Sequence, residues 1–372
     1  MYLRTRVLIG ALRRLPKPEP PTAAYLAGVR RELPRRLARL VLGPVGRDVD
    51  IDDLSVPVEG ARLRIRLYRR QDVTGPTPLV VNFHGGGFVY GNLTTADWLC
   101  GNLAARLPVT VASVDYRLAP EHPAPGPFSD CWRATRWLVE HAPRLGADPA
   151  RVSVMGESAG GNLAALVALA SRDARRADPS WPALDRQLLL YPITDLTLGS
   201  PSIDALPDAP MLQRRSLDWF GRRYVPQGRP DSLDPADPWV SPLHAPDHTD
   251  LPPTLVIAAG QDPLRDDALR YADALERAGV AVRRVVYPEA IHGFASIPLF
   301  EPSARAALDE VVTELTEPSG ARTLIDRGAA PAAKARATVR LAARAGLEGY
   351  PQEPPGCRTT GPYRAGPTRE SS

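Results

Sequence analysis

The chain has 372 residues, of which 44% are hydrophobic and 24% charged; this composition is typical of a globular protein, and the length suits one large α/β domain with insertions or two ordinary domains. No apolar run approaches the length of a membrane-spanning helix, and the three cysteines, which are widely spaced and form no C-x-x-C pair, argue against a disulfide framework and a zinc site. The net charge of +4 comes from the two ends, because residues 1–45 carry +8 and residues 319–372 carry +5, whereas residues 46–318 carry −9. The chain has no nucleic-acid-binding motif, and together with this charge distribution that argues against a nucleic-acid partner.

Residues 1–45 predict two helices, at about 2–15 and 22–42, separated by the proline cluster PKPEPP. In the first, apolar residues recur at helical spacing opposite several arginines. We expect this segment to pack on the body as part of a cap; a helix lying on a membrane surface is the alternative. The short apolar core between residues 7 and 12 is followed by no small-residue cleavage site. We therefore expect no secretory signal and a cytoplasmic protein.

Residues 46–318 alternate between strand-like and helix-like patterns. Buried or alternating apolar runs predict strands at 62–68, 78–83, 109–115, 151–155, 187–192, 254–260 and 282–287. Helical spacing is found at 94–107, 128–142, from 162 onward, at 266–279 and at 302–316. This alternation predicts an α/β domain with a mainly parallel sheet covered on both faces. Ligand sites in such sheets lie beyond the carboxyl ends of the strands.

Two further segments stand apart from this pattern. Residues 193–250 form an insert rich in Pro and Asp, with one helix-like stretch, RRSLDWFGRRY. The insert is too long for an ordinary connection, and we expect it to form a lid together with the N-terminal helices. Residues 319–372 change to Ala, Arg, Gly and Pro, the composition of a disordered or partly helical tail.

The stretch RVSVMGESAGGNLAALVALA places Ser158 where a strand gives way to a helix. A corner that tight forces its central residue into a strained backbone conformation, and bulky residues two positions away on either side would collide. Gly156 and Gly160 remove those side chains. An ordinary turn is the alternative for a G-x-S-x-G match, so a nucleophilic Ser158 needs partners elsewhere.

Those partners are expected at other strand ends, because a serine needs a base, and the base works best when a carboxylate orients it. Asp262 follows the strand 254–260, and His292 follows the strand 282–287. The chain order Ser158, Asp262, His292 is the one that a nucleophile elbow of this kind requires. Asp266 and Asp267 stand close enough to compete with Asp262, but acids there also suit the start of the next helix.

The stretch NFHGGGFVYG, directly after the strand 78–83, predicts a site for the oxyanion. Consecutive glycines let backbone N–H groups face a ligand, and we expect the donors to be the amides of Gly85, Gly86 and Ala159. A flexible turn is one alternative; a phosphate loop is another, but the Lys-Ser/Thr ending is missing. His84 is expected to order the loop rather than to transfer protons.

These residues and blocks resemble a family, the hormone-sensitive-lipase-like carboxylesterases (bacterial family IV) of the α/β-hydrolase fold. The likeness runs from about residue 50 to 316, through HGGGFVYG, DYRLAPEHPAP, GESAGGNLAA, YPITD, VSPLHA, DPLRDD and IHGF. It implies a serine carboxylesterase with Ser158 as nucleophile, His292 as base and then acid, and Asp262 as orienting carboxylate. It also implies a small-molecule ester substrate and neither metal nor cofactor. Glu157 departs from the Asp or Thr more usual in the family.

Several alternatives stay open at this stage. His244 and His248 could form a metal pair, but the intervening Pro246 favours a loop. The same triad could cleave an amide, an acetylated compound or a lactone, since the pocket rather than the triad sets the substrate. A non-catalytic receptor is a third possibility, which the presence of His292 argues against. We expect a monomer or a homodimer.

Overall fold

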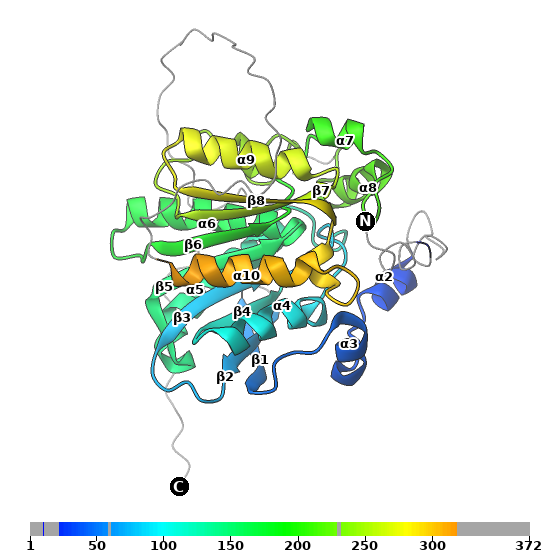
Figure 1. Cartoon of the computed structure of the whole chain (residues 1–372). Coiled ribbons are helices and arrows are strands. Elements are labelled where there is room, and N and C mark those ends of the chain that lie inside the picture. Colours follow the sequence, from blue (N-terminus) through cyan, green and yellow to red (C-terminus); the bar gives the residue numbers. More distant parts are fainter. Residues whose placement is uncertain (1–9, 11–21, 59–60, 229–231, 318–372) are drawn as a thin grey trace.

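The computed structural model describes residue 10 and residues 22–58, 61–228 and 232–317 (Figure 1). Its centre is an eight-stranded sheet with the order β1-β2-β4-β3-β5-β6-β7-β8. The strands are β1 (Val49–Val58), β2 (Ala61–Arg70), β3 (Thr77–Phe83), β4 (Thr110–Asp115), β5 (Ala147–Glu157), β6 (Leu184–Leu190), β7 (Thr254–Gln261) and β8 (Val282–Ile291). The expected tail at 319–372 lies outside the described residues.

The sheet is mainly parallel, as the alternating pattern predicts. Strands β3 to β8 all run parallel to one another, whereas β1 and β2 form an antiparallel pair at one edge, and β2 runs antiparallel to β4. All seven predicted strands are present. Strand β1 was not predicted, because its acidic stretch DIDDLSVPV leaves most of its side chains exposed or half-exposed at the edge of the sheet.

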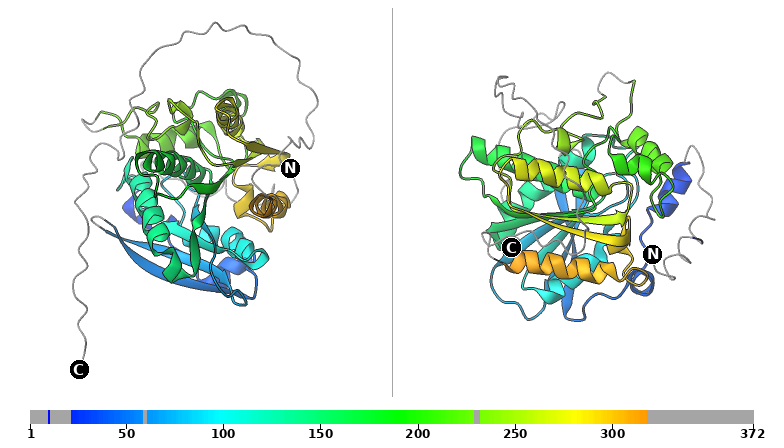
Figure 2. Two further views of the ribbon diagram at one scale, coloured as in Figure 1. Left: turned by 90° about the vertical axis from the view of Figure 1, so that its left-hand side faces the viewer. Right: turned by 45° about the horizontal axis from the view of Figure 1, so that its top comes forward.

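Helices cover both faces of the sheet (Figure 2). One face packs against α4 (Leu93–Arg106) and α10 (Ser303–Thr316), and the other against α5 (Gly126–His141), α6 (Ala159–Ala177) and α9 (Arg265–Arg277). The strands supply both layers by their period of two: Leu79, Val81 and Phe83 of β3 belong to the α5–α6–α9 side, and Val80 belongs to the α4–α10 side. Burial on both faces explains why these strands are apolar throughout.

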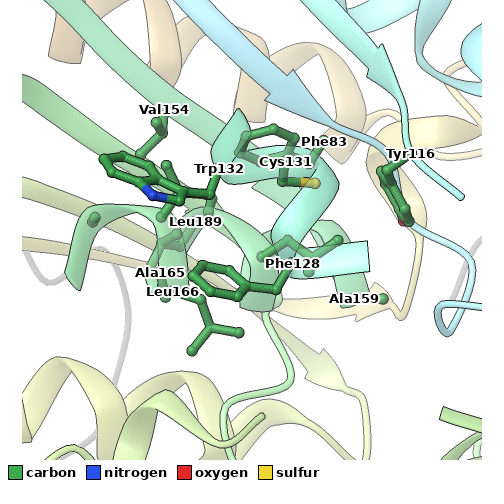
Figure 3. Close-up of a cluster of buried hydrophobic side chains, with 14 of the residues drawn as sticks. Phe83, Tyr116, Phe128, Cys131, Trp132, Val154, Ala159, Ala165, Leu166 and Leu189 are labelled. Atoms are coloured by element: carbon green, nitrogen blue, oxygen red, sulfur yellow. The ribbon is translucent and has the colours of Figure 1, made fainter. Parts of the chain in front are cut away.

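The contact between α5 and α6 forms the larger core layer. Figure 3 shows Phe128, Cys131 and Trp132 of α5 beside Val154 of β5 and Leu166 of α6, all of them buried. Cys131 and Cys100 are free, buried thiols. Cys357 lies outside the described residues.

The N-terminal segment differs from its prediction. The helix expected over 22–42 is two shorter helices, α2 (Ala23–Val29) and α3 (Arg35–Leu42), with Pro34 at the start of the second. A proline has no N–H to donate and disfavours a helical conformation in the residue before it, so a continuous helix through Pro34 was the wrong expectation. Of the helix expected at 2–15, only Gly10 is described.

The insert at 193–250 contains α7 (Pro201–Ala205), α8 (Arg214–Tyr224) and the short 3₁₀ helix η2 (Pro242–His244). Helix α8 coincides with the predicted stretch, whereas α7 is too short to leave a periodic signal. Helices α2, α7 and α8 lie on the same side of the molecule (Figure 1). The remaining 3₁₀ helices are η1 (Ala142–Leu145) and η3 (Phe294–Ser296). Within the described ranges, every helix is too short or too polar to cross a bilayer.

Candidate active site

Ser158 occupies a sharp corner between β5 and α6. Its backbone has φ 56° and ψ −118°, a conformation that non-glycine residues rarely adopt and that must be held by its surroundings. A Cβ on Gly156 would lie 2.1 Å from the carbonyl oxygen of Gly160, and a Cβ on Gly160 would lie 2.0 Å from the carbonyl oxygen of Phe83. The expected collision across the corner is confirmed for Gly156, whereas a side chain on Gly160 would collide with the end of β3. Both glycines are needed for the corner to form.

Ser158, His292 and Asp262 form one hydrogen-bonded chain. Nε2 of His292 lies 2.8 Å from Oγ of Ser158, and Nδ1 lies 2.7 Å from Oδ2 of Asp262. The carboxylate accepts a hydrogen bond from Nδ1–H, which leaves Nε2 free to accept the proton of the serine hydroxyl. The three side chains come from the ends of β5, β7 and β8; β8 is longer than predicted, so His292 follows it directly. The geometry is that of an activated nucleophile.

The competing acids are engaged elsewhere. Asp262 is fully buried, and its second oxygen accepts a hydrogen bond from the backbone N–H of Leu264. Asp266 pairs with the neighbouring Arg265. Asp267 is buried at the start of α9 and accepts hydrogen bonds from the backbone of Thr194 and Asp195, where the insert begins. Burial raises the pKa of Asp267 to about 7.

Residues 85–91 form a glycine-rich loop, the glycine loop, which lies against the corner at Ser158. A Cβ on Gly85 would be 3.6 Å from the Cβ of Ser158, and Gly85 and Gly86 line the same cavity as that serine. Gly86 has φ +127°, and a Cβ there would lie 2.3 Å from the carbonyl oxygen of Tyr90, so only glycine fits. Ala159 is the first residue of α6, where a backbone N–H has no acceptor within the helix and the helix dipole favours negative charge.

His84 lies behind this loop, away from the serine chain. Its Nδ1 lies 2.8 Å from the carbonyl oxygen of Gly85, and its ring stacks on Tyr116 with centroids 4.4 Å apart. The Tyr116 hydroxyl donates to the His84 carbonyl oxygen at 2.7 Å. Complete burial lowers the pKa of His84, which keeps the ring neutral. His84 therefore orders the loop, as the sequence predicts.

A cavity of about 450 Å³ opens beside Ser158. It is bounded by the carboxyl ends of the strands, by α2 and by the insert, and its lining is mostly apolar. The side chains from α2 and the insert are Tyr25, Val29, Ile193, Leu196, Leu198, Met211, Leu212, Leu217 and Phe220. The block YPITD contains Ile193 and the helix-like stretch RRSLDWFGRRY contains Phe220, but neither pattern assigns these side chains to a cavity. A hydrophobic acyl chain is the kind of group that such a cavity accommodates.

Glu157 lies buried beneath the serine chain. Its Oε2 accepts hydrogen bonds from the hydroxyls of Tyr191, at 2.5 Å, and Ser296, at 2.6 Å. Burial raises the pKa of Glu157. The Tyr191 ring meets the His292 ring edge to face, with centroids 5.2 Å apart. Glu157 thus holds Tyr191 in place against the ring of His292.

The described part of the chain holds no group of three His, Cys, Asp or Glu side chains arranged to bind a metal ion. His244 instead bonds Asp195, at 3.0 Å, and His248 bonds the carbonyl oxygen of Pro242, at 2.9 Å. The two histidines therefore have separate partners in the insert.

Comparison with known proteins shows the family of the chain. A family model described as the alpha/beta hydrolase fold matches residues 80–296. The chain belongs to the α/β-hydrolase family. Within this family, it is 41% identical to the carboxylic ester hydrolase LipN of Mycobacterium tuberculosis, over 72% of this chain and 70% of that protein. It is also 37% identical to an ethyl acetate hydrolase of Pseudomonas putida, over 75% and 86%.

Solved structures of this α/β-hydrolase group superpose on the chain as well. An ester hydrolase from the metagenome of Lake Arreo, EH1AB1, has a TM-score of 0.75 at 35% identity, covering 85% of this chain and 98% of that one. That structure holds the protein in complex with a derivative of bipyridine phosphonate. The predicted fold class is confirmed, and so is the resemblance to the hormone-sensitive-lipase-like carboxylesterases.

Proposed function

We propose that this α/β-hydrolase cleaves short- to medium-chain carboxylic esters through an acyl-enzyme on Ser158. The observation that carries the proposal is the hydrogen-bonded chain Ser158–His292–Asp262 at the floor of an apolar cavity. The names of the relatives, a carboxylic ester hydrolase and an ethyl acetate hydrolase, support an ester as the substrate. Amides and lactones have no comparable support from the relatives or from the cavity.

In the first step Ser158 attacks the ester carbonyl while His292 takes the hydroxyl proton through Nε2. Asp262 holds the imidazole in the required tautomer and stabilises the positive charge that develops on it. The carbonyl oxygen becomes an oxyanion, for which Gly85, Gly86 and Ala159 are the proposed N–H donors. Each such donor is worth about 10²–10³ in rate.

Collapse of the tetrahedral intermediate expels the alcohol, which receives its proton from His292. The acyl group remains on Ser158. Water then enters, gives a proton to His292 and attacks the acyl carbonyl, and a second collapse releases the carboxylic acid and restores the Ser158 hydroxyl. Each proton taken by His292 is returned in the same half-reaction, so no external acid or base is needed.

We propose that the chain divides into a catalytic domain and a cap. Residues 46–318 would form the catalytic domain, and residues 1–45 together with the insert 193–250 would form its cap. Tyr25 from the first part and Phe220 from the second line the cavity above Ser158. We infer that these two parts of the cap set the range of acyl groups accepted.

The test is hydrolysis of p-nitrophenyl esters from acetate to palmitate, with Ser158→Ala as the paired variant. We expect turnover of the shorter esters, reduced at least about 10³-fold in the variant. The variant loses only a hydroxyl group, so its thermal unfolding should match that of the wild type. Folded wild-type protein that cleaves none of these esters would overturn the proposal, as would a variant that retains the wild-type rate.

A further inference from the structure

The guanidinium of Arg30, just after α2, binds the glycine loop and the segment beside it. Its Nε donates to the carbonyl oxygen of Val89 at 2.8 Å, and its Nη2 donates to the carbonyl oxygen of Ala119 at 2.6 Å. Its Nη1 pairs with Glu121 at 3.0 Å. In return, the Arg30 carbonyl oxygen accepts a hydrogen bond from the side chain of Asn92 at 3.0 Å. One residue of the N-terminal segment therefore contacts the loop at both ends of residues 89–92.

The loop that Arg30 grips is strained. Gly86, Gly87 and Phe88 all have positive φ, at 127°, 61° and 62°, and for Phe88 this is unfavourable. The loop's internal support is a short turn in which Val89 and Tyr90 donate to the Gly86 carbonyl oxygen. Strained conformations persist only where neighbouring structure over-determines them. Contacts from outside the loop therefore bear on the direction of its backbone amides.

Ala119, in the segment after β4, makes one such contact with the loop and is itself bound by Arg30. The backbone N–H of Ala119 donates to the Phe88 carbonyl oxygen at 2.9 Å. The carbonyl of the same Ala119 accepts from Arg30, so the guanidinium bridges the loop to the segment that braces it. Only an arginine offers a planar fork that reaches two carbonyl groups and a carboxylate together. Its side chain is 20% exposed, and its two bonds to carbonyl groups are partly buried, whereas the pair with Glu121 is exposed.

We infer that Arg30 is a positioning residue for ester hydrolysis: by fixing Val89 and Ala119 it holds the Gly85 and Gly86 amides in place for the oxyanion. This inference rests on the proposed function, in which those amides stabilise the tetrahedral intermediate. It assigns to the N-terminal segment a part in the chemical step, in addition to covering the cavity.

A purely structural role predicts something different. Arg30 also anchors α2, whose Tyr25 and Val29 line the cavity, so its loss could act on substrate binding alone. Glu32 separates the two roles. It anchors the same segment through Arg64, Arg66 and Thr94, and all three partners lie outside residues 85–92. Loosening the segment at Glu32 therefore leaves the two carbonyl groups gripped by Arg30 untouched.

The experiment compares Arg30→Met, Arg30→Lys and Glu32→Gln with the wild type, using kcat and KM for p-nitrophenyl butyrate and the melting temperature of each protein. We expect Arg30→Met to lower kcat about 10- to 50-fold with KM changed less than about threefold, because displaced donors act on the transition state. The lysine of Arg30→Lys can reach one carbonyl group, so the kcat of this variant should lie between those of the wild type and Arg30→Met. Glu32→Gln should keep kcat within about threefold of the wild type, even if its melting temperature falls as far as that of Arg30→Met.

A second readout does not depend on ester turnover. Phosphonylation of Ser158 by a p-nitrophenyl phosphonate, followed by mass spectrometry, places a phosphoryl oxygen where the ester's oxyanion would form. We expect the labelling rate to fall with kcat in Arg30→Met and to be unchanged in Glu32→Gln. Arg30→Ala should recover part of its lost kcat in millimolar ethylguanidinium, which can fill the vacated site, and ethylammonium should restore less.

Two results would overturn the inference. One is an Arg30→Met variant with wild-type kcat and labelling rate but a raised KM, which would mean that Arg30 serves the cap alone. The other is an equal loss of kcat in Arg30→Met and Glu32→Gln, which would trace the effect to the segment as a whole. Both differ from a failure of the proposed function, in which the wild type itself would show no Ser158-dependent hydrolysis.

Discussion

The hydroxyl of Tyr191 donates a 2.5 Å hydrogen bond to the buried carboxyl group of Glu157. Tyr191 follows β6 with an unusual positive φ of 38°, and Glu157 immediately precedes Ser158. Through this bond the ends of β5 and β6 are joined directly behind His292, whose ring meets that of Tyr191. A carboxyl group in the nucleophile motif thus has a structural explanation that does not require it to exchange protons with the substrate.

Replacing Glu157 by Ala should destabilise the protein. The change leaves the buried hydroxyl group of Tyr191 and the half-buried one of Ser296 without their acceptor. A buried polar group without a partner costs about 1–3 kcal/mol, so we expect the free energy of unfolding to fall by about 2–4 kcal/mol. Glu157→Gln keeps one acceptor oxygen and should lose about half as much. Urea denaturation of both variants measures this; equal stability of Glu157→Ala and the wild type would contradict it.

Gly160→Ala should prevent the nucleophile corner from forming. The added methyl group would lie 2.0 Å from the Phe83 carbonyl oxygen and 2.6 Å from that of His84. Both are backbone atoms that cannot rotate away, so we expect a loss of about 3 kcal/mol or more together with loss of ester hydrolysis.

Gly221→Ala is the matched control for that change. Gly221 lies inside α8, and a methyl group added to it would meet no other atom within 4 Å. Alanine favours a helix over glycine by about 1 kcal/mol, so this variant should be as stable as the wild type or more so. Thermal unfolding of the two variants side by side checks the pair. A Gly160→Ala protein that folds and hydrolyses esters normally would show that the corner tolerates a side chain.

The parts of this molecule that the sequence predicts are those with a local cause. Gly156 must be small because it faces Gly160 across a single turn, and that requirement is visible in five consecutive residues; Gly160 must be small for a different reason, because it lies against Phe83 and His84. The strand β5 and the helix α6 likewise carry their own periodicity. The position of His292 beside Ser158 follows from the rule that parallel strands end at one edge.

The remaining parts have causes that lie far away in the chain. Arg30 bonds Val89 and Ala119, 59 and 89 residues later, and nothing in the neighbourhood of Arg30 indicates those partners. Edge strand β1 is exposed and acidic, so its structure comes from pairing with β2 rather than from burial. The cavity lining from α2 and α8 depends on tertiary packing, which a single sequence without motifs does not encode locally.

Asp267 should make stability depend on pH. Its pKa is about 7 in the folded protein, against an ordinary value of 3.8, so between about pH 4 and pH 7 the folded state holds a proton that the unfolded state has released. The free energy of unfolding must then decrease as pH rises through this window, by at most about 1.4 kcal/mol per pH unit. Asp267→Asn has no such proton to lose.

Urea denaturation at pH 5 and pH 8 tests this difference. From pH 5 to pH 8 the wild type should lose about 1–3 kcal/mol more than Asp267→Asn. The asparagine oxygen can still accept the backbone hydrogen bonds of Thr194 and Asp195, which makes the variant a close match. Parallel pH dependence in the two proteins would show that Asp267 is ionised in the folded state throughout this range.

Phe220 should limit the length of the acyl group. Its ring carbons approach to 2.5 Å from the position that a Cβ on Gly87 would occupy, so α8 rests directly on the glycine loop with Phe220 in the cavity wall. The ring also meets Tyr90 edge to face, with centroids 5.5 Å apart. Phe220→Ala removes a large part of this wall and enlarges the space beside Ser158. Longer acyl chains then have more apolar surface to contact.

We expect Phe220→Ala to raise kcat/KM for p-nitrophenyl octanoate relative to acetate by about 10-fold, since one or two further buried methylene groups are worth about 0.8 kcal/mol each. Phe220→Leu should shift the ratio less, because it retains much of the side-chain volume. Met211→Ala is the control on the same cavity: Met211 also lines it but is 39% exposed, so its truncation opens space that water already reaches. A ratio that moves equally in Met211→Ala and Phe220→Ala would mean that the cavity mouth, rather than the wall above the glycine loop, selects the acyl chain.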